Sequence, residues 1–259
     1  DYTEVDSTVF STGVLNTMIK NAENRIYRDS DSDGFADRED DCDSTEGSST
    51  EDRKGCPDSD SDGWSDAGDR FPSDGTQWND IDGDGYGDNP APANLPDSCP
   101  TTFGNSDQDR YGCRDSDLDG WSDPDPNAIY ATQPWNISDG ADAFDTDSTQ
   151  WSDFDSDGYG DNWDDPSWNE SRAINGLGVW YVGATQPDAC PTRAGQSFED
   201  RLGCPDSDGD GWSNPDESWK AENGSDAFPG DSTQWSDRDL DGFGDNSEGN
   251  NPDAFPDNP

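Results

Sequence analysis

The chain has 259 residues, with 62 acidic side chains against 14 basic ones, no histidine and a formal net charge of −48. Apolar residues make up only 26%, too few for a large hydrophobic core. The charge excludes nucleic acid as a partner, because phosphates would be repelled, and no apolar run approaches the roughly 20 residues of a membrane span. The six cysteines and the 11% of aromatic residues argue against disorder. We therefore expect a fold that counter-charge holds together.

Residues 1–28 differ from the rest of the chain and form a predicted N-terminal cap or assembly segment. The stretch 3–12 is rich in Val and Thr, which predicts a strand. From residue 14 onward the apolar residues follow helical spacing, and Ser11 or Thr12 is a suitable N-cap. This spacing predicts a helix over residues 13–26 with an apolar face of Val14, Leu15, Met18, Ile19, Ala22 and Ile26.

Residues 29–259 contain seven tandem copies of the pattern D-x-D-x-D-G-x-x-[DN], which begin at residues 29, 58, 80, 115, 153, 206 and 237. We number these Asp loops in chain order and count positions from the first Asp. Carboxylates at positions 1, 3 and 5 can surround one cation, Gly at position 6 permits the bend, position 7 offers a backbone carbonyl, and position 9 adds an oxygen ligand. Such hard oxygen ligands favour Ca²⁺ over Mg²⁺. The predicted ligands are Asp29, Asp31, Asp33, Phe35, Asp37, Asp58, Asp60, Asp62, Trp64, Asp66, Asp80, Asp82, Asp84, Tyr86, Asp88, Asp115, Asp117, Asp119, Trp121, Asp123, Asp153, Asp155, Asp157, Tyr159, Asp161, Asp206, Asp208, Asp210, Trp212, Asn214, Asp237, Asp239, Asp241, Phe243 and Asp245.

Each loop also needs a closing ligand after position 9. Asp40 and Asp69 occupy position 12 in the first two loops, whereas later loops carry the signature D-x-[CF] after a longer insert. Glu217 and Glu248 stand at the literal position 12 of loops six and seven and compete for the closing role. We expect surface inserts at 124–141, 162–187 and 215–225, because such insertions cost little once their ends are held together. They follow loops four, five and six and are called inserts four, five and six. The predicted closing aspartates are Asp40, Asp69, Asp97, Asp142, Asp188, Asp226 and Asp253.

Two kinds of linker alternate between the Asp loops. After loops one, three and five comes C-x13-C, the Cys linker, and its equal spacings predict the disulfides Cys42–Cys56, Cys99–Cys113 and Cys190–Cys204. Zinc is disfavoured because histidine is absent. After loops two, four and six comes F-[PD]-x-D-[SG]-T-Q-W-[SN]-D, the TQW linker. Its aspartates Asp74, Asp147 and Asp231 share one register and are predicted to bridge a second ion, so we expect at least seven Ca²⁺ ions and up to about two per repeat.

The aromatic residues keep a fixed register with the predicted ligands. Trp78, Trp151 and Trp235 lie in the TQW linkers, and position 7 is Trp in even loops but Phe or Tyr in odd ones. Two interpretations stay open: small hydrophobic wedges between metal sites, which we favour, or a sugar-stacking surface. In the inserts, residues 178–183 predict a strand of a small hairpin. Three sequons predict glycosylation of a secreted protein, at Asn136, Asn169 and Asn223.

This arrangement resembles the thrombospondin type 3 repeat, which reads roughly C-P-x-x-x-N-x-x-Q-x-D-x-D-x-D-G-x-G-D. Here residues 228–231 (FPGD) lead through Gln234 to Asp237, Asp239, Asp241, Gly242 and the Gly244–Asp245 pair. The resemblance covers residues 29–259 and implies a secreted, calcium-wrapped chain with little regular secondary structure and about two ions per repeat. The linkers look like those of large surface proteins of archaea and bacteria. Phe replaces the family's Cys in half of the linkers, so its disulfide pattern and ion count do not carry over.

The leading functional hypothesis is an extracellular or cell-surface structural protein, an elongated rod or filament subunit that folds around a ladder of Ca²⁺ ions. The sequence ends within a TQW linker and begins without one. Either subunits associate head to tail into a filament, or the chain is part of a longer one. The alternative function is an adhesin that binds a glycan or a protein partner through the inserts. No enzyme is expected, because each Asp pair is accounted for as a ligand and no Ser or Thr has a base. A disordered calcium buffer would need neither disulfides nor a fixed aromatic register.

Overall fold

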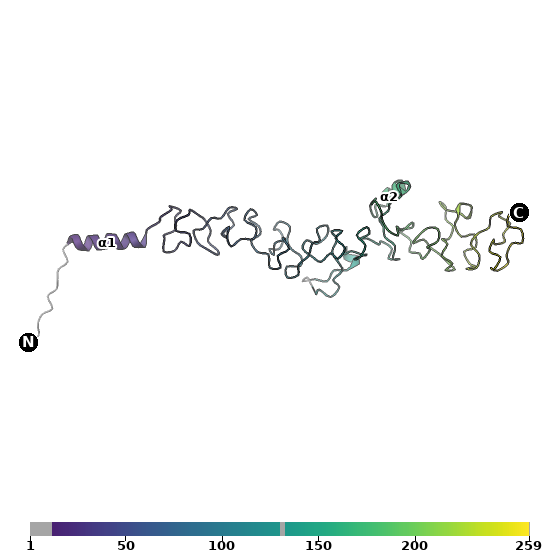
Figure 1. Cartoon of the computed structure of the whole chain (residues 1–259), viewed down its shortest axis with the longest axis horizontal. Coiled ribbons are helices and arrows are strands. Elements are labelled where there is room, and N and C mark those ends of the chain that lie inside the picture. Colours follow the sequence, from purple (N-terminus) through teal and green to yellow (C-terminus); the bar gives the residue numbers. More distant parts are fainter. Residues whose placement is uncertain (1–11, 130–132, 259) are drawn as a thin grey trace, which may run out of the picture. The chain divides into compact units, whose positions relative to one another are not determined.

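Irregular coil makes up nearly all of the chain that the computed structural model describes, residues 12–129 and 133–258 (Figure 1). These ranges contain isolated β-bridges but no β-strand. The mostly irregular fold predicted from composition and repeats is thereby confirmed. The regular elements are α1 (Thr12–Ile26), the short 3₁₀ helices η1 (Ile137–Asp139) and η2 (Pro166–Trp168), α2 (Asn169–Asn175), and η3 (Ala221–Asn223).

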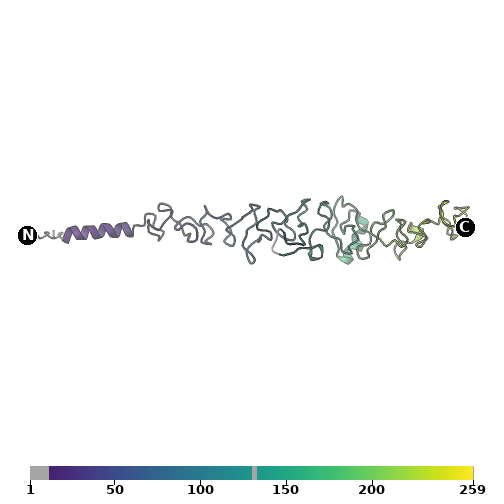
Figure 2. The ribbon, with the colours of Figure 1, turned by 90° about the horizontal axis from the view of Figure 1, so that it is seen from below.

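The chain divides into two compact units, one up to Phe103 and one from Gly104 onward. The first contains α1 and Asp loops one to three. The second contains loops four to seven, and its four short helical segments all lie within the predicted inserts 124–141, 162–187 and 215–225 (Figures 1 and 2). Within the described repeats, helical structure is therefore confined to the inserts, and the Asp loops and linkers are built from turns.

The predicted N-terminal helix is confirmed, because α1 spans Thr12–Ile26. Its apolar residues Leu15, Met18 and Ile19 are exposed. The strand predicted over 3–12 and the possible cap Ser11 fall on residues outside the described range, apart from Thr12, which is helical.

The buried side chains are mainly polar, as a chain with so few apolar residues requires. The buried apolar residues are cysteines, Ala141, Trp163 and Ala184, whereas the largest fully buried side chains are Gln77, Gln150 and Gln234. A buried polar group must be hydrogen-bonded, or its desolvation is not compensated. The packing of each repeat therefore depends on which groups these glutamines contact.

Each buried glutamine belongs to a TQW linker and fixes the Asp loop that follows it. Gln150 Nε2 donates to the carbonyls of Asn162 and Thr185 at 3.0 and 2.7 Å, and its Oε1 accepts from the Asn162 N–H at 2.9 Å. Gln77 and Gln234 form the same three bonds in loops three and seven. Position 8 must be glycine in these loops, because a Cβ on Gly160 would lie 2.0 Å from Gln150 Oε1.

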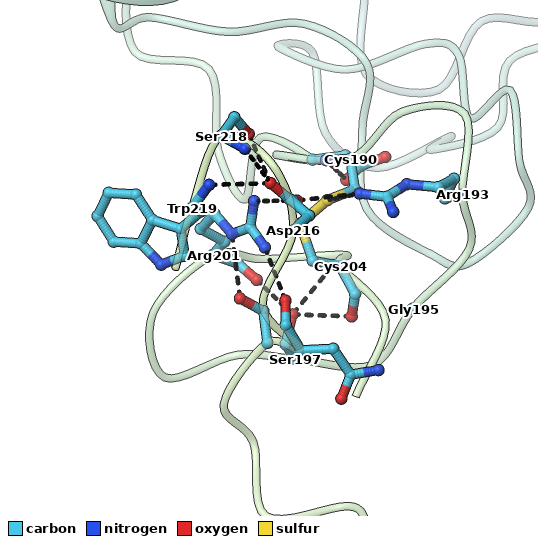
Figure 3. Close-up of a disulfide and its surroundings, with 12 residues drawn as sticks. Cys190, Arg193, Gly195, Ser197, Arg201, Cys204, Asp216, Ser218 and Trp219 are labelled. Atoms are coloured by element: carbon cyan, nitrogen blue, oxygen red, sulfur yellow. Dashed lines mark hydrogen bonds and ion pairs between the residues drawn. A yellow bond between two sulfur atoms is a disulfide. The ribbon is translucent and has the colours of Figure 1, made fainter. Parts of the chain in front are cut away.

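The Cys linkers contain a buried serine instead. Ser197 Oγ accepts from the Cys204 N–H at 3.0 Å and donates to backbone carbonyls of the same linker (Figure 3). Ser49 and Ser106 do the same in their linkers. Disulfides join Cys42 to Cys56 and Cys190 to Cys204 as predicted. Cys99 and Cys113 are disulfide-bonded as well, and the described chain has no free cysteine.

Insert six is attached to its Cys linker by a charged cluster (Figure 3). Arg201 Nη1 donates to Asp216 Oδ2 at 2.8 Å, and its guanidinium lies 5.8 Å from the centre of the Trp219 ring. Burial acts to raise the pKa of Asp216, but hydrogen bonds from Ser218 and Arg201 outweigh it and hold this pKa well below its usual value. The insert is thus fixed by an ion pair that does not involve the Asp loops.

The recurring tryptophans form stacked pairs. Trp121 of loop four lies 6.2 Å from Trp151 of the following TQW linker, with an interplanar angle of 11°. Trp64 with Trp78, and Trp212 with Trp235, repeat this geometry at 6.1 and 6.4 Å. Each pair connects an even Asp loop to the next linker, as the wedge interpretation requires.

The strand predicted over residues 178–183 is wrong. Trp180 forms only an isolated bridge with Trp163, and the Val179 N–H donates to the Asn162 side chain rather than to a neighbouring strand. Gly178 has a left-handed φ of 63°, which interrupts an extended chain. The sequence reading also missed α2 in the same insert.

Candidate metal sites

The carboxylates of each Asp loop gather in a small volume. Seven groups of described acidic residues each place their ligand atoms within 4.8 Å of one another, among them Asp29, Asp31 and Asp33 and the equivalent triplets of loops two to five. Clusters of hard oxygen donors at such separations can hold a metal ion.

The backbone turns that form the loops recur from repeat to repeat, except that in loop seven the bond from the position 4 N–H to the first Asp is missing and Asp237 Oδ1 has no partner. In loop four, Asp115 Oδ1 accepts from the Leu118 N–H at 2.7 Å and its Oδ2 accepts from the Gly120 N–H at 2.9 Å. Asp119 Oδ1 accepts from the Trp121 N–H at 2.8 Å. The position 6 glycines all have φ between 90° and 104°, a left-handed conformation that strongly favours glycine. The bend predicted at position 6 is therefore present in all seven loops.

Many of the remaining carboxylate oxygens have no hydrogen-bond partner. Buried oxygens without a partner occur in all seven loops, and in loop four they are Asp117 Oδ2, Asp119 Oδ2 and Asp142 Oδ2. Apart from two nitrogens of Arg172 and Ser225 Oγ, every buried unpartnered side-chain polar atom in the described chain belongs to a predicted ligand. Buried carboxylates without donors are strongly unfavourable. The donor set therefore fits a cation at each loop.

Two recurring hydrogen bonds position the closing aspartates. The Asp142 N–H donates to the carbonyl of Ser122 at position 8, and the same bond, at 2.8–2.9 Å, closes loops two to seven across inserts of very different length. The closing Asp Oδ1 then accepts from the N–H two residues later, at 2.6–2.7 Å in all seven loops. This second bond explains the fixed spacing of D-x-[CF].

In loops six and seven the structure places the Asp, and not the competing Glu, next to the other loop carboxylates. Asp226 is fully buried and interacts electrostatically with Asp206, Asp208 and Asp210, whereas Glu217 is exposed. In loop seven Asp253 interacts with Asp239 in the same way, and Glu248 is exposed.

Burial and mutual repulsion perturb the closing aspartates strongly. Burial, assisted by the neighbouring loop carboxylates, raises the pKa of Asp142 and Asp188 to about 8. The same causes raise the pKa of Asp97 and Asp226 to about 7. A carboxyl group with such a pKa is poorly stabilised as an anion, so a bound cation would remove a large unfavourable interaction.

Position 4 carries backbone strain that the sequence pattern did not predict. Ser32, Ser61, Leu118, Ser156 and Leu240 have φ between 63° and 72°, although none of them is glycine. Loops three and six carry Gly83 and Gly209 there, with φ of 83° and 81°. The occurrence of Gly at this position in two of the seven loops was the available signal.

The aspartates predicted to bridge a second ion lie in hydrogen-bonded turns. Asp74 accepts from the Thr76 hydroxyl at 2.7 Å and from Asn94 Nδ2, and these bonds lower its pKa, the Thr76 bond most. Asp147 accepts from Thr149 and Thr185, and Asp231 from Thr233 and Asn250. A second ion at these residues stays a prediction, as does ligation by the position 7 carbonyls.

The three sequons lie in inserts of the second unit. Asn136 precedes η1 and is half-buried, with its Nδ2 donating to Asp139 at 2.9 Å. Asn169 and Asn223 are exposed, and Asn169 Oδ1 accepts from the Trp163 indole. Glycosylation of these residues stays a prediction.

No family model matches this chain, and no curated protein matches it significantly. Within the described residues, no helix combines the length and apolar character that crossing a membrane requires. The disulfides fit a secreted or extracellular protein. The fold and its sites thus define a disulfide-bonded, mostly irregular repeat chain with acidic clusters that can bind metal ions.

Proposed function

We propose that this chain is an extracellular structural protein whose repeats are folded around Ca²⁺ ions. The observation that carries the proposal is the convergence of buried, unpartnered carboxylate oxygens in every Asp loop. Without a cation these groups repel one another, so metal binding contributes directly to the free energy of folding. Seven divalent ions would add 14 positive charges against the net charge of −48.

The donor set supports calcium over other metals. The described loops offer carboxylates and an amide, without the thiolates or imidazoles that zinc and copper prefer, because every cysteine is in a disulfide. Inserts of different length and a closing ligand from a separate turn suit the variable coordination of Ca²⁺ better than the strict octahedron of Mg²⁺. We expect affinities typical of extracellular modules, with Kd about 10⁻⁴–10⁻³ M.

The resemblance to thrombospondin type 3 repeats supports the same reading. In this proposal the repeats form an elongated rod, because each loop is closed by its own linker and no hydrophobic core draws the repeats together. Head-to-tail association of such rods into a filament is the further part of the proposal. Electron microscopy and small-angle scattering in millimolar Ca²⁺ test rod and filament, and compact particles under these conditions would contradict both.

Chelation tests the calcium dependence itself. In excess EDTA, near-ultraviolet circular dichroism should lose the signal of the stacked tryptophans, and hydrogen exchange of the loops should rise. Added Ca²⁺ should restore both cooperatively, whereas equimolar Mg²⁺ should restore little. Spectra unchanged by EDTA would refute the proposal.

A cleft in the second unit favours binding of a glycan as a second candidate function. It has a volume of about 690 Å³ and is lined by Trp121, Trp151, Phe154, Leu177 and Asp153 among others. Aromatic faces beside carboxylates and hydroxyls are suited to a sugar ring. A glycan array tests this function: Phe154→Ala should abolish binding, while Phe198→Ala, which alters an exposed phenylalanine outside the cleft lining, should not.

A further inference from the structure

One buried arginine, Arg172, interacts electrostatically with the fifth Asp loop. Arg172 of α2 is only 3% exposed, and it is the only buried one among the lysines and arginines whose side-chain exposure is described. Its guanidinium carbon lies 5.6 Å from the centre of the Trp163 ring and 5.2 Å from that of Trp168. Insert five thus holds a desolvated positive charge between two aromatic rings.

The hydrogen-bonding state of this arginine is unusual. Nη1 and Nη2 are buried and have no hydrogen-bond partner, and Oδ1 of Asp161, a carboxylate on which the Arg172 charge acts, is likewise unpartnered. Arginine nitrogens buried without acceptors are costly. Arg172 therefore interacts electrostatically with Asp161 and Asp188, but its two terminal nitrogens form no hydrogen bond to either carboxylate.

The carboxylates that Arg172 influences are predicted calcium ligands. Its charge acts on Asp188, the closing aspartate, and on Asp161 at position 9, and it counteracts the effect of burial on the pKa of both. No basic group is among the main influences on the closing aspartates Asp97, Asp142 and Asp226.

Other arginines contact loop aspartates only from the surface. Arg28 lies 3.2 Å from Asp37 and Arg114 lies 3.0 Å from Asp123, but both arginine side chains are more than half exposed. Water and salt screen such pairs, so their energetic effect is small. Arg172 is shielded from that screening by insert five.

We propose that Arg172 is a fixed counter-ion of the fifth Asp loop, which weakens Ca²⁺ binding there and keeps that loop ordered after calcium has left. The inference rests on the proposed calcium function. With Ca²⁺ bound, the cation and the guanidinium repel each other. When Ca²⁺ leaves, Asp161 and Asp188 turn to the free nitrogens of Arg172, and the repulsion among the carboxylates that disorders the other loops is partly cancelled.

Hydrogen exchange followed by mass spectrometry, with the full chain titrated over free Ca²⁺, tests this inference. In the wild type, peptides covering residues 153–188 should gain full protection at a Ca²⁺ concentration at least roughly tenfold above that of the other loops, because the guanidinium repels the divalent ion. The same peptides should keep part of their protection in EDTA. Arg172→Gln should shift the fifth-loop midpoint down by about tenfold and abolish the protection in EDTA.

Two further variants separate charge from packing. Arg172→Lys keeps the charge and should preserve the high midpoint, whereas Arg110→Gln removes a half-buried arginine that lies over Trp135 and should leave the fifth loop unchanged. A fifth-loop midpoint equal to the others in the wild type, or one that Arg172→Gln leaves in place or Arg172→Lys lowers as Gln does, would overturn the inference. If no loop responds to Ca²⁺, the proposed function itself fails.

Discussion

Gln150 and Asn162 form a closed pair of hydrogen bonds, in which the Asn162 N–H donates to Gln150 Oε1 and Gln150 Nε2 donates to the Asn162 carbonyl. The side-chain amide thus occupies the place that a neighbouring strand would take. Its second N–H bond, to Thr185, joins the two ends of insert five. One buried glutamine therefore connects the TQW linker, the Asp loop and the insert.

Replacing this glutamine should be costly. Gln150→Leu leaves the N–H and the carbonyl of buried Asn162 without partners and removes the donor to the Thr185 carbonyl, so we expect a loss of about 2–4 kcal/mol of unfolding free energy. Urea denaturation in saturating Ca²⁺ measures it. Gln108→Leu, at an exposed glutamine, should change stability by less than about 0.5 kcal/mol. Equal effects of the two substitutions would show that the buried amide is not the connecting element.

The closing aspartate of loop six can be distinguished from its rival by counting ions. Asp226→Ala should remove or strongly weaken one Ca²⁺ site, because the buried carboxylate next to Asp208 and Asp210 is lost. Glu217→Ala should retain the wild-type number, since Glu217 is exposed. Native mass spectrometry at fixed free Ca²⁺ reads both results. The opposite outcome would assign the closing role to Glu217.

The raised pKa values predict how the metal-free chain responds to pH. Asp142 and Asp188 have pKa values of about 8 in the folded chain against 3.8 for a free carboxyl, so the folded state binds more protons. Its stability in EDTA should therefore be highest at low pH and decline as pH rises from about 4 through about 8. Near-ultraviolet circular dichroism in EDTA should recover between pH 8 and pH 5. A signal that weakens on acidification would contradict this assignment.

The same protons compete with calcium. Because Asp142 and Asp188 must release a proton to bind Ca²⁺, the affinity should fall as pH drops below about 8. Isothermal titration calorimetry in buffers of different ionisation enthalpy would detect the released protons. A Kd that is independent of pH between 5 and 8 would show that these carboxyls are ionised without metal.

The strained position 4 offers a stabilising substitution. Leu118 is 72% exposed and has φ of 70°, so Leu118→Gly should raise the unfolding free energy by about 1 kcal/mol through relief of the left-handed strain. Ile81→Gly, at an exposed apolar residue without positive φ, should instead lower it, because glycine adds entropy to the unfolded chain. Thermal unfolding in Ca²⁺ compares the two. Loss of stability in both variants would mean that the strain is negligible.

Much of the repeat architecture could be predicted from the sequence because its chemistry is local. The Asp loops, their Gly bends and the disulfides at Cys42–Cys56 and Cys190–Cys204 depend on residues close in the chain. The role of Gln150 was missed, although its spacing of 12 residues to Asn162 recurs in Gln77–Asn89 and Gln234–Asn246, because a polar residue in an irregular chain gives no sign that it is buried. The incorrect strand at 178–183 arose because its β-branched and aromatic residues are typical of strands, whereas in the structure they are exposed and form only one isolated bridge, between Trp180 and Trp163.

The bond from each closing aspartate to the position 8 carbonyl has a practical consequence for engineering. It forms equally well whether 2 or 26 residues separate position 9 from the closing aspartate, as in loops two and five. The segment between position 9 and the closing aspartate is thus a suitable insertion site for grafted peptides. A foreign epitope or enzyme-recognition tag placed there would be displayed on the surface, while the Asp loop next to it folds as before.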